Sequence, residues 1–340
     1  MDILLLGTLT ISAAGLLNGT FVFPMKLVRD WNWENIWLLF ALFGLIVLPG
    51  VVAFTTVDGL MQIYRTVPTA TLLVALLLGL GWGMGSLLFG LGVAALGFSL
   101  GYMLVMGTTA VIGTIIPALL ANPAAFASGR GIRLLGSLLL ILLGLVLCAI
   151  AGRRREQDQE GRTESYRVLT QTRFHRGLAI CLGSGVLSAC FNIGFALTTD
   201  IQKAAQTAGA TPGNASFSVW ALIMAAGAIP SLVYCVFLLL KKKSYRLFGA
   251  GGRNWIYGFM MALLWLLTLR LYGLGAHYVG DQGATIGWPV MTASAIIGAN
   301  VLGILGGEWK GVSKDVRNRL YTGLGILIVA VALAGSAASA

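Results

Sequence analysis

Charged side chains interrupt or follow the apolar runs of this sequence at a few places, and their chemistry suits holding a polar substrate. Arg270 lies inside an apolar run that begins near Trp255, and His277 and Asp281 follow at its end. A charged side chain at bilayer depth costs at least a few kcal/mol, so it usually faces protein or a water-filled cavity. We therefore place Arg270 in a substrate-binding set. The alternatives are an ion pair with Asp200 or Asp281, or a side chain that extends outward to the membrane surface.

Three titratable residues are candidates for proton coupling. Asp200, with Lys203 beside it, ends one apolar run, and His277 and Asp281 lie in a turn on the same predicted side of the membrane. A carboxylate in low-dielectric surroundings has a raised pKa, and histidine titrates near neutral pH. The alternative for each residue is a solvated side chain at the membrane edge.

Neutral polar and aromatic residues inside the apolar runs could contact a sugar. A carboxamide both donates and accepts hydrogen bonds, as sugar hydroxyls require, and aromatic faces suit the C–H face of a sugar ring. The alternatives are interhelical hydrogen bonds, worth ~0.6–2 kcal/mol each, and aromatic side chains that only pack or lie at the membrane interface. The substrate-binding candidates beside Arg270 are Asn18, Trp82, Tyr102, Asn192, Tyr272, Trp288 and Asn300. Asn192 is favoured among the amides because it lies in the middle of its run.

Composition identifies the broad class of the protein. Hydrophobic residues make up 57% and charged residues 10% of the chain, whereas a soluble domain carries roughly 25% charged residues. The chain is therefore expected to be an all-α integral membrane protein. The net charge of +11 comes from residues clustered between apolar runs, which favours a lipid bilayer over nucleic acid as the partner.

Enzyme and metal chemistry find little support in the sequence. The four cysteines all lie in apolar runs, where they are typical of small core residues. We find no His-Glu-x-x-His pattern, no pair of acids inside a span and no phosphate-binding loop. We therefore predict no metal, no cofactor and no enzymatic activity.

The apolar runs predict ten transmembrane helices, since a span needs about 20 mainly apolar residues. A charge-rich break at 151–176 divides them into a first repeat at 1–150 and a second at 177–340. Because each half has five helices, an odd number, the two repeats must lie inverted in the membrane. The predicted spans are 3–23, 36–54, 69–90, 97–119, 132–150, 177–200, 216–240, 255–276, 284–306 and 320–337.

Two pairs of matching stretches support the repeat. Trp82, Phe89-Gly90 and Gly97 recur as Trp265, Tyr272-Gly273 and Gly280 at one offset of 183 residues, and the stretch from Gly15 to Phe21 recurs from Gly185 to Phe191 at an offset of 170. Repeated halves of membrane helices are typical of transporters that bind their substrate between the halves.

The distribution of Lys and Arg predicts the orientation. Of the 23 such residues, 18 fall in the loops that follow odd-numbered spans and 4 in the loops on the other side. The positive-inside rule then puts the 151–176 linker in the cytoplasm and both termini outside. We expect a multi-pass protein of the cell inner membrane.

The first loop carries a specific pattern. Pro24 closes the first span, basic residues follow, and Trp31-x-Trp33-Glu34-x-x-Trp37 comes next. This pattern resembles the L-rhamnose–proton symporter family of the drug/metabolite transporter superfamily. Further stretches are similar in the same order: Trp82-Gly83 to Gly113-Thr114 and Pro117, Gly185 to Ala189, and Tyr272, Gly275, Gln282, Ile286 and Trp288 leading to Glu308-Trp309.

The resemblance implies a ten-helix inverted-repeat fold that imports a small sugar, L-rhamnose or a related deoxyhexose, together with protons through alternating access. The sequence departs from the family pattern at Ala284, where the resemblance implies an acidic residue before Trp288; the nearest acid is Asp281. The alternative is a metabolite or drug exporter of the same superfamily.

Overall fold

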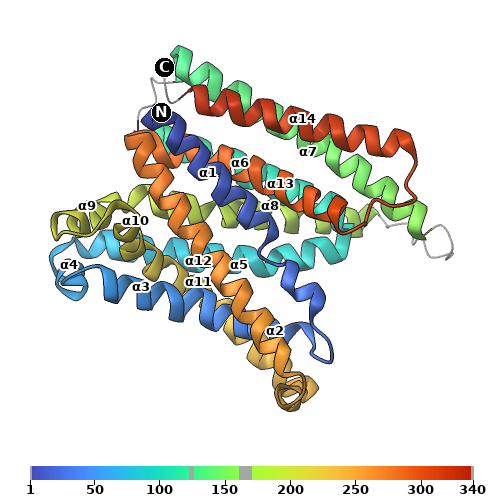
Figure 1. The fold of residues 1–340 in the computed structure, drawn as a ribbon, viewed down its shortest axis with the longest axis horizontal. Coiled ribbons are helices and arrows are strands. Elements are labelled where there is room, and N and C mark those ends of the chain that lie inside the picture. Colours follow the sequence, from blue (N-terminus) through green and yellow to red (C-terminus); the bar gives the residue numbers. More distant parts are fainter. Residues whose placement is uncertain (1, 122–125, 161–170, 338–340) are drawn as a thin grey trace.

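The computed structural model describes residues 2–121, 126–160 and 171–337, and this part of the chain is helical without strands. Asp2 accepts a hydrogen bond from Leu4 N and so caps the first helix. The long helices are α1 (Ile3–Thr20), α5 (Thr69–Leu96), α6 (Phe98–Ala121), α7 (Gly129–Glu160), α8 (Gln171–Leu197), α11 (Phe217–Lys242), α12 (Gly252–Val279), α13 (Gly283–Leu305) and α14 (Lys314–Ser336). Figure 1 shows them as one bundle.

Short helices connect or extend the long ones. The second predicted span is a helix with a π-helical middle, formed by α2 (Trp33–Phe40), η2 (Ala41–Val47) and α3 (Leu48–Thr56). Several connections that the sequence analysis left as loops are helical, namely η1 (Phe23–Leu27), α4 (Leu60–Thr66), α9 (Thr199–Thr207), α10 (Pro212–Ala215) and η4 (Ser244–Gly249).

Nine stretches of the described residues are long and apolar enough to cross a membrane. The stretch from Gly252 to Leu305 is 54 residues long and holds both α12 and α13, which the short η5 turn (Gly280–Gln282) separates. Very short turns therefore join α5 to α6 and α12 to α13. Gly97 and Gly280 end α5 and α12 with φ of 85° and 83°, a backbone conformation that is accessible to glycine at little cost.

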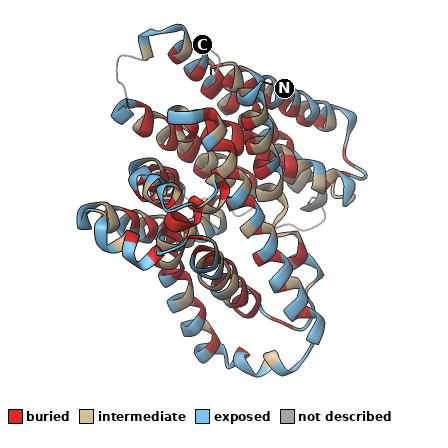
Figure 2. Cartoon of the chain, turned by 60° about the vertical axis from the view of Figure 1, so that its left-hand side comes forward, coloured by how far each residue is buried: buried red, intermediate tan, exposed pale blue. Residues whose placement is uncertain are grey.

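α1 and α8 each pack against a pair of consecutive helices. α1 lies against α12 and α13, whereas α8 lies against α5 and α6. Glycines permit these close contacts, because a Cβ at Gly15 or Gly19 of α1 would collide with the backbone of α13. α7 and α14 pack together along one side of the bundle (Figure 1). Figure 2 shows that buried residues face the helix contacts, while exposed residues cover the outside.

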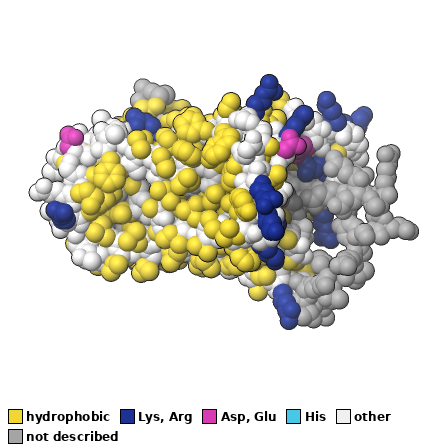
Figure 3. Space-filling view, turned by 90° about the horizontal axis from the view of Figure 1, so that it is seen from below, with side chains coloured by type: hydrophobic (Ala, Val, Ile, Leu, Met, Phe, Trp, Pro, Cys, Tyr) yellow, Lys and Arg dark blue, Asp and Glu magenta, His cyan; other side chains and the backbone are white. Residues whose placement is uncertain are grey.

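The surface has the polarity of a membrane protein. Figure 3 shows a broad hydrophobic face, with most of the visible Lys and Arg side chains gathered toward one end. Lys26, Arg155 and Lys242 lie in η1, in the last part of α7 and at the end of α11. The predicted linker 151–176 is partly helical, since α7 continues through Arg155 to Glu160; residues 161–170 of that linker lie outside the described residues.

Candidate functional site

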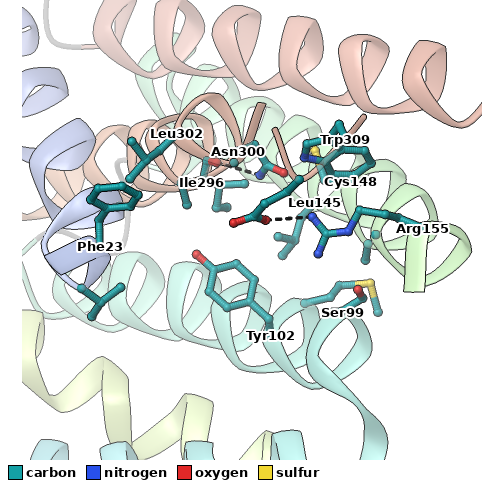
Figure 4. A pocket seen from close by; sticks show the side chains of 18 of the residues that line it. Phe23, Ser99, Tyr102, Leu145, Cys148, Arg155, Ile296, Asn300, Leu302 and Trp309 are labelled. Carbon is teal, nitrogen blue, oxygen red and sulfur yellow. Dashed lines mark hydrogen bonds and ion pairs between the residues drawn. The ribbon is translucent and has the colours of Figure 1, made fainter. Parts of the chain in front are cut away.

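A cavity of about 340 Å³ lies at the basic end of the bundle, between η1, α6, α7 and α13. Its wall is mostly apolar, with a small number of polar groups that converge on it (Figure 4). This is the usual composition of a small-molecule site, which spans about 300–1,000 Å³. The polar and aromatic lining residues are Phe23, Lys26, Ser99, Tyr102, Cys148, Arg155, Asn300, Glu308 and Trp309.

A carboxylate and two cations meet at this cavity. Glu308, in the turn after α13, forms ion pairs with Lys26 of η1 and with Arg155 of α7. The Arg155 Nη1 to Glu308 Oε2 distance is 2.9 Å, and the Arg155 guanidinium lies 4.8 Å from the centre of the Trp309 ring. We call Lys26, Arg155 and Glu308 the charge triad. It joins residues from opposite ends of the chain.

The two cations of the charge triad favour the ionised form of Glu308. Partial burial raises the pKa of this carboxyl, because it disfavours the charged form. The hydrogen bond and charge of Lys26, followed by the charge of Arg155, lower the pKa and outweigh burial, so the net pKa is below the ordinary value. Glu308 is therefore an anion at neutral pH in this arrangement.

Two of the predicted substrate-binding residues line the cavity. Tyr102 comes from α6, and its ring packs edge-on against Phe89 with centroids 6.2 Å apart. Asn300 comes from α13, and its Nδ2 donates to the carbonyl oxygen of Ile296 in its own helix at 2.8 Å. Figure 4 shows the Tyr102 hydroxyl directed into the space between the helices. Both residues bring hydrogen-bonding groups to an otherwise apolar wall.

A second polar cluster, which we call the Asn192 network, contains Asn192, Tyr272 and Trp288. Asn192 Nδ2 donates to the carbonyl oxygens of Gly113 and Ala284 at 2.8 and 3.0 Å, and Tyr272 Oη donates to Asn192 Oδ1 at 2.6 Å. The Trp288 indole nitrogen donates to the Thr109 carbonyl oxygen at 3.0 Å. All three side chains are buried. The network thus joins α6, α8, α12 and α13, which matches the interhelical alternative for Asn192.

Aromatic rings surround the Asn192 network. Trp82 is half-buried and stacks on Trp265, with ring planes 12° apart and centroids 6.1 Å apart. Phe191 lies between Trp82 and Trp220. The indole nitrogens of Trp220 and Trp265 are buried without a hydrogen-bond partner among the described residues. Trp82 thus packs in an aromatic cluster and does not line the cavity.

The remaining predicted residues lie apart from the cavity. Asn18 is half-buried on α1. Arg270 is exposed and donates to Asn214 Oδ1 of α10, so it pairs with neither of the two acids that the sequence suggested. The three proton-coupling candidates, Asp200 of α9, His277 of α12 and Asp281 of η5, are all exposed. The structure does not bring these residues to the cavity.

The Trp-rich first loop has a clear structural role. Glu34 is buried, accepts from Ser244 Oγ at 2.7 Å and forms an ion pair with Lys242 at 3.1 Å. The Trp31 indole donates to the Ala250 carbonyl oxygen at 2.8 Å. This loop of the first half is therefore held against the loop between α11 and α12 by hydrogen bonds and an ion pair.

Sequence reasoning missed the charge triad. The sequence analysis assigned no site role to Lys26 or Arg155 and named Glu308 only within a stretch similar to the family. The available signal was an acidic residue within a loop otherwise rich in Lys and Arg. Among the described residues, no group of His, Cys, Asp and Glu could hold a metal ion. The cavity is instead suited to bind a neutral polar molecule and to exchange a proton at Glu308.

Comparison with known proteins covers almost the entire chain. Residues 3–340 match the family model described as L-rhamnose-proton symport protein. An L-rhamnose-proton symporter of Pectobacterium atrosepticum is 26% identical over 324 residues, which are 93% of this chain and 92% of that protein. The symporters of Cronobacter sakazakii and Yersinia pestis are 27% and 26% identical over 326 and 325 residues, with the same coverage.

Proposed function

Because the chain belongs to the L-rhamnose-proton symport protein family, we propose that it imports L-rhamnose or a related deoxyhexose together with protons through alternating access. The family is one of multi-pass membrane symporters, not of enzymes, and the sequence resemblance is confirmed. The observation that carries the proposal to this chain is the cavity, in which an ionisable carboxylate lies beside neutral hydrogen-bonding groups. Sugar and proton thus have adjacent sites.

The sugar site that we propose is this cavity. Tyr102 and Asn300 provide a hydroxyl and an amide from facing helices, and Trp309 provides an aromatic ring. Its volume of about 340 Å³ is at the small end of the usual range for ligand sites, in keeping with a monosaccharide. Asn192, Tyr272 and Trp288 satisfy one another or the backbone, so we assign them to the framework around the site.

Internal symmetry of the contacts supports two inverted repeats, 1–150 and 177–340, joined by the 151–176 linker. Trp82 and Trp265, which correspond by the 183-residue offset, stack on each other. Phe191 packs on Trp82 and its counterpart Phe21 packs on Trp265, with centroids 5.4 and 5.0 Å apart. Helix pairs follow the same rule, since α8 with α5 corresponds to α1 with α12.

The orientation follows from the same charge bias that the sequence shows. The Lys and Arg side chains gathered at one end of the molecule in Figure 3 support a cytoplasmic location of that end. The cavity then lies toward the cytoplasmic side, and both termini lie on the outer side of the inner membrane. Export of a metabolite or drug by the same fold is less favoured, because the matched relatives are named as symporters.

The test is uptake of labelled L-rhamnose into liposomes that contain the purified protein. With the membrane potential held at zero, a gradient of one pH unit, acidic outside, drives about tenfold accumulation if one proton moves with each sugar. Gradient-driven accumulation supports the proposal, and competition by unlabelled deoxyhexoses defines the substrate class. Transport of L-rhamnose without any response to the gradient would exclude coupling, and no transport of any sugar by folded protein would exclude the function.

A further inference from the structure

The charge triad connects the two halves of the chain at the wall of the cavity. Glu308 follows α13 in the second half, whereas Lys26 follows α1 in the first half, and Arg155 lies where the last helix of the first half, α7, continues into the linker. Glu308 is the carboxylate that lines the cavity in the described part of the chain. Its side chain is 34% exposed, so the carboxylate is accessible to water from the cavity. A proton can therefore reach this group.

We propose that Glu308 is the proton-coupling carboxylate, and that its protonation releases Lys26 and Arg155 so that the cavity opens to the basic end of the molecule. This inference rests on the proposed function and names the residue that performs the coupling. A symporter must allow proton and sugar to change the same conformational equilibrium, since a ligand shifts an equilibrium only through its different affinity for the two states. The charge triad gives Glu308 a different affinity for the proton in the two states.

Electrostatics gives the direction of the effect. The titratable or charged groups that face Glu308 across the cavity are Lys26 from η1, Tyr102 from α6, and Cys148 and Arg155 from α7. Only Lys26 and Arg155 are cations, and both ion pairs need an ionised carboxylate. A proton on Glu308 removes the negative charge that both cations share, so the attraction between the turn after α13 and the first half is lost.

The two arrangements hold a proton with different strength. With the charge triad formed, the cations keep the pKa of Glu308 below its ordinary value. When the cations move away, burial alone acts on the carboxyl, and burial raises the pKa. The separated arrangement thus binds the proton more tightly. By linkage, a proton on Glu308 favours separation, and return of the cations expels the proton.

Each transport cycle returns Glu308 to its starting state and leaves every proton accounted for. A proton from the outer solution forms an O–H bond on the Glu308 carboxyl while sugar occupies the cavity. The charge triad separates, the sugar leaves toward the basic end, and the same proton then passes to the inner solution. The ionised Glu308 pairs again with Lys26 and Arg155. One proton crosses the membrane with each sugar, and no other reactant is consumed.

Asp315 provides a matched control for Glu308. It also pairs with two arginines, Arg154 of the first half at 2.7 Å and Arg319 at 3.0 Å. Its side chain is 60% exposed and does not line the cavity. If bridging the halves were sufficient for coupling, Asp315→Asn and Glu308→Gln would have equal effects. Our inference predicts that only the change at Glu308 uncouples.

The experiment compares two assays on the same proteoliposomes. Counterflow, the exchange of labelled for unlabelled L-rhamnose, needs alternating access but no proton gradient, whereas net accumulation needs coupling. For Glu308→Gln we expect counterflow to continue while accumulation under one pH unit falls from about tenfold to about one. Asp315→Asn should retain both activities. Accumulation by Glu308→Gln at the wild-type level would overturn the inference.

A second variant covers the case in which Glu308→Gln does not fold. Glu308→Asp keeps the carboxyl but shortens its reach to the cations, so the pH of half-maximal accumulation should shift relative to wild type. An unchanged pH profile in Glu308→Asp, with transport intact, would overturn the inference. Wild-type protein that transports no sugar in either assay would instead refute the proposed function. If Asp200→Asn or Asp281→Asn lost accumulation while Glu308→Gln kept it, the proton-coupling residue would be one of these aspartates at the opposite end of the molecule.

Discussion

The cavity and the Asn192 network are both polar clusters inside an apolar bundle, but they satisfy their polar groups in opposite ways. In the Asn192 network, the buried side chains of Asn192, Tyr272 and Trp288 bond one another or backbone carbonyls. At the cavity, charges of opposite sign meet beside open space. A saturated network fixes helices in place, whereas a charge pair beside a cavity can respond to a ligand or a proton.

This difference matters because polar residues in membrane spans are usually taken as functional. Asn192 is a buried amide in α8 and would be a natural first choice for mutagenesis. Its carboxamide already makes three hydrogen bonds, so it has little capacity left for a sugar. The cavity residues are closer to the end of the bundle, and their charges come from turns and helix ends. Position within a span is thus a weaker guide than hydrogen-bond saturation.

The largest expected effect is on stability and belongs to the Asn192 network. Asn192→Ala removes three hydrogen bonds between helices and leaves the Tyr272 hydroxyl without its acceptor, so we expect a loss of about 2–4 kcal/mol. Asn300→Ala removes only a bond to its own helix, and we expect a change within about 0.5 kcal/mol. Denaturant unfolding in detergent micelles measures both. Equal losses in the two variants would contradict the distinction drawn here.

The next effect concerns the two cations of the charge triad. The Arg155 side chain is 18% exposed and also lies over Trp309, whereas Lys26 is 60% exposed. An exposed ion pair is worth about 0–1 kcal/mol, and a less exposed pair with an added cation–π contact is worth more. In transport assays, Arg155→Gln should therefore reduce L-rhamnose accumulation more than Lys26→Gln does. The reverse order would assign the main role to Lys26.

A smaller effect is the response of stability to pH. The pKa of Glu308 is lowered in this structure from an ordinary value of 4.5. A group with a lowered pKa contributes stability that is complete above its ordinary value and disappears as pH falls through the lowered one. The difference in melting temperature between wild type and Glu308→Gln should thus narrow when pH decreases from neutral to below 4.5. A difference that widens on acidification would contradict this sign.

The smallest effects are expected at the opposite end of the molecule. Asp200, His277 and Asp281 are exposed, and substitutions at exposed sites usually change free energies by no more than about 0.5 kcal/mol. Asp200→Asn, His277→Gln and Asp281→Asn should therefore keep L-rhamnose accumulation close to the wild-type level. A strong loss in any one of them, measured in the same liposomes, would restore it as a coupling residue.

Much of the fold could be predicted from local patterns in the sequence. Apolar runs located the long helices, and Gly97 and Gly280, which correspond at the 183-residue offset, end α5 and α12 in the structure. Asn192 makes interhelical hydrogen bonds of the kind that the sequence analysis gave as its alternative role, since an amide inside an apolar helix must find a partner nearby. The ends of the helices were harder to predict from the sequence. α7 passes through a run of arginines where the sequence analysis ended the span, because charge does not stop a helix that extends into water.

The charge triad could not be predicted in the same way. Lys26 and Glu308 are 282 positions apart, and Arg155 and Glu308 are 153 apart. No periodic pattern connects residues at such separations, and only the packing of η1 and α7 around the turn after α13 brings them together. Lys26 and Arg155 also satisfy the positive-inside rule, so membrane orientation alone explained them adequately. Tertiary structure was needed to show that they hold a carboxylate at a cavity.

Two single-cysteine variants distinguish the cavity from the Asn192 network as the place where the sugar binds. Ala149 lines the cavity, and Ala284 lies beside the Asn192 network. In protein whose four native cysteines are replaced by serine, Ala149→Cys and Ala284→Cys are alkylated with and without L-rhamnose. We predict that the sugar slows alkylation of Ala149→Cys and leaves that of Ala284→Cys unchanged. Protection of Ala284→Cys alone would contradict the account and place the sugar at the Asn192 network.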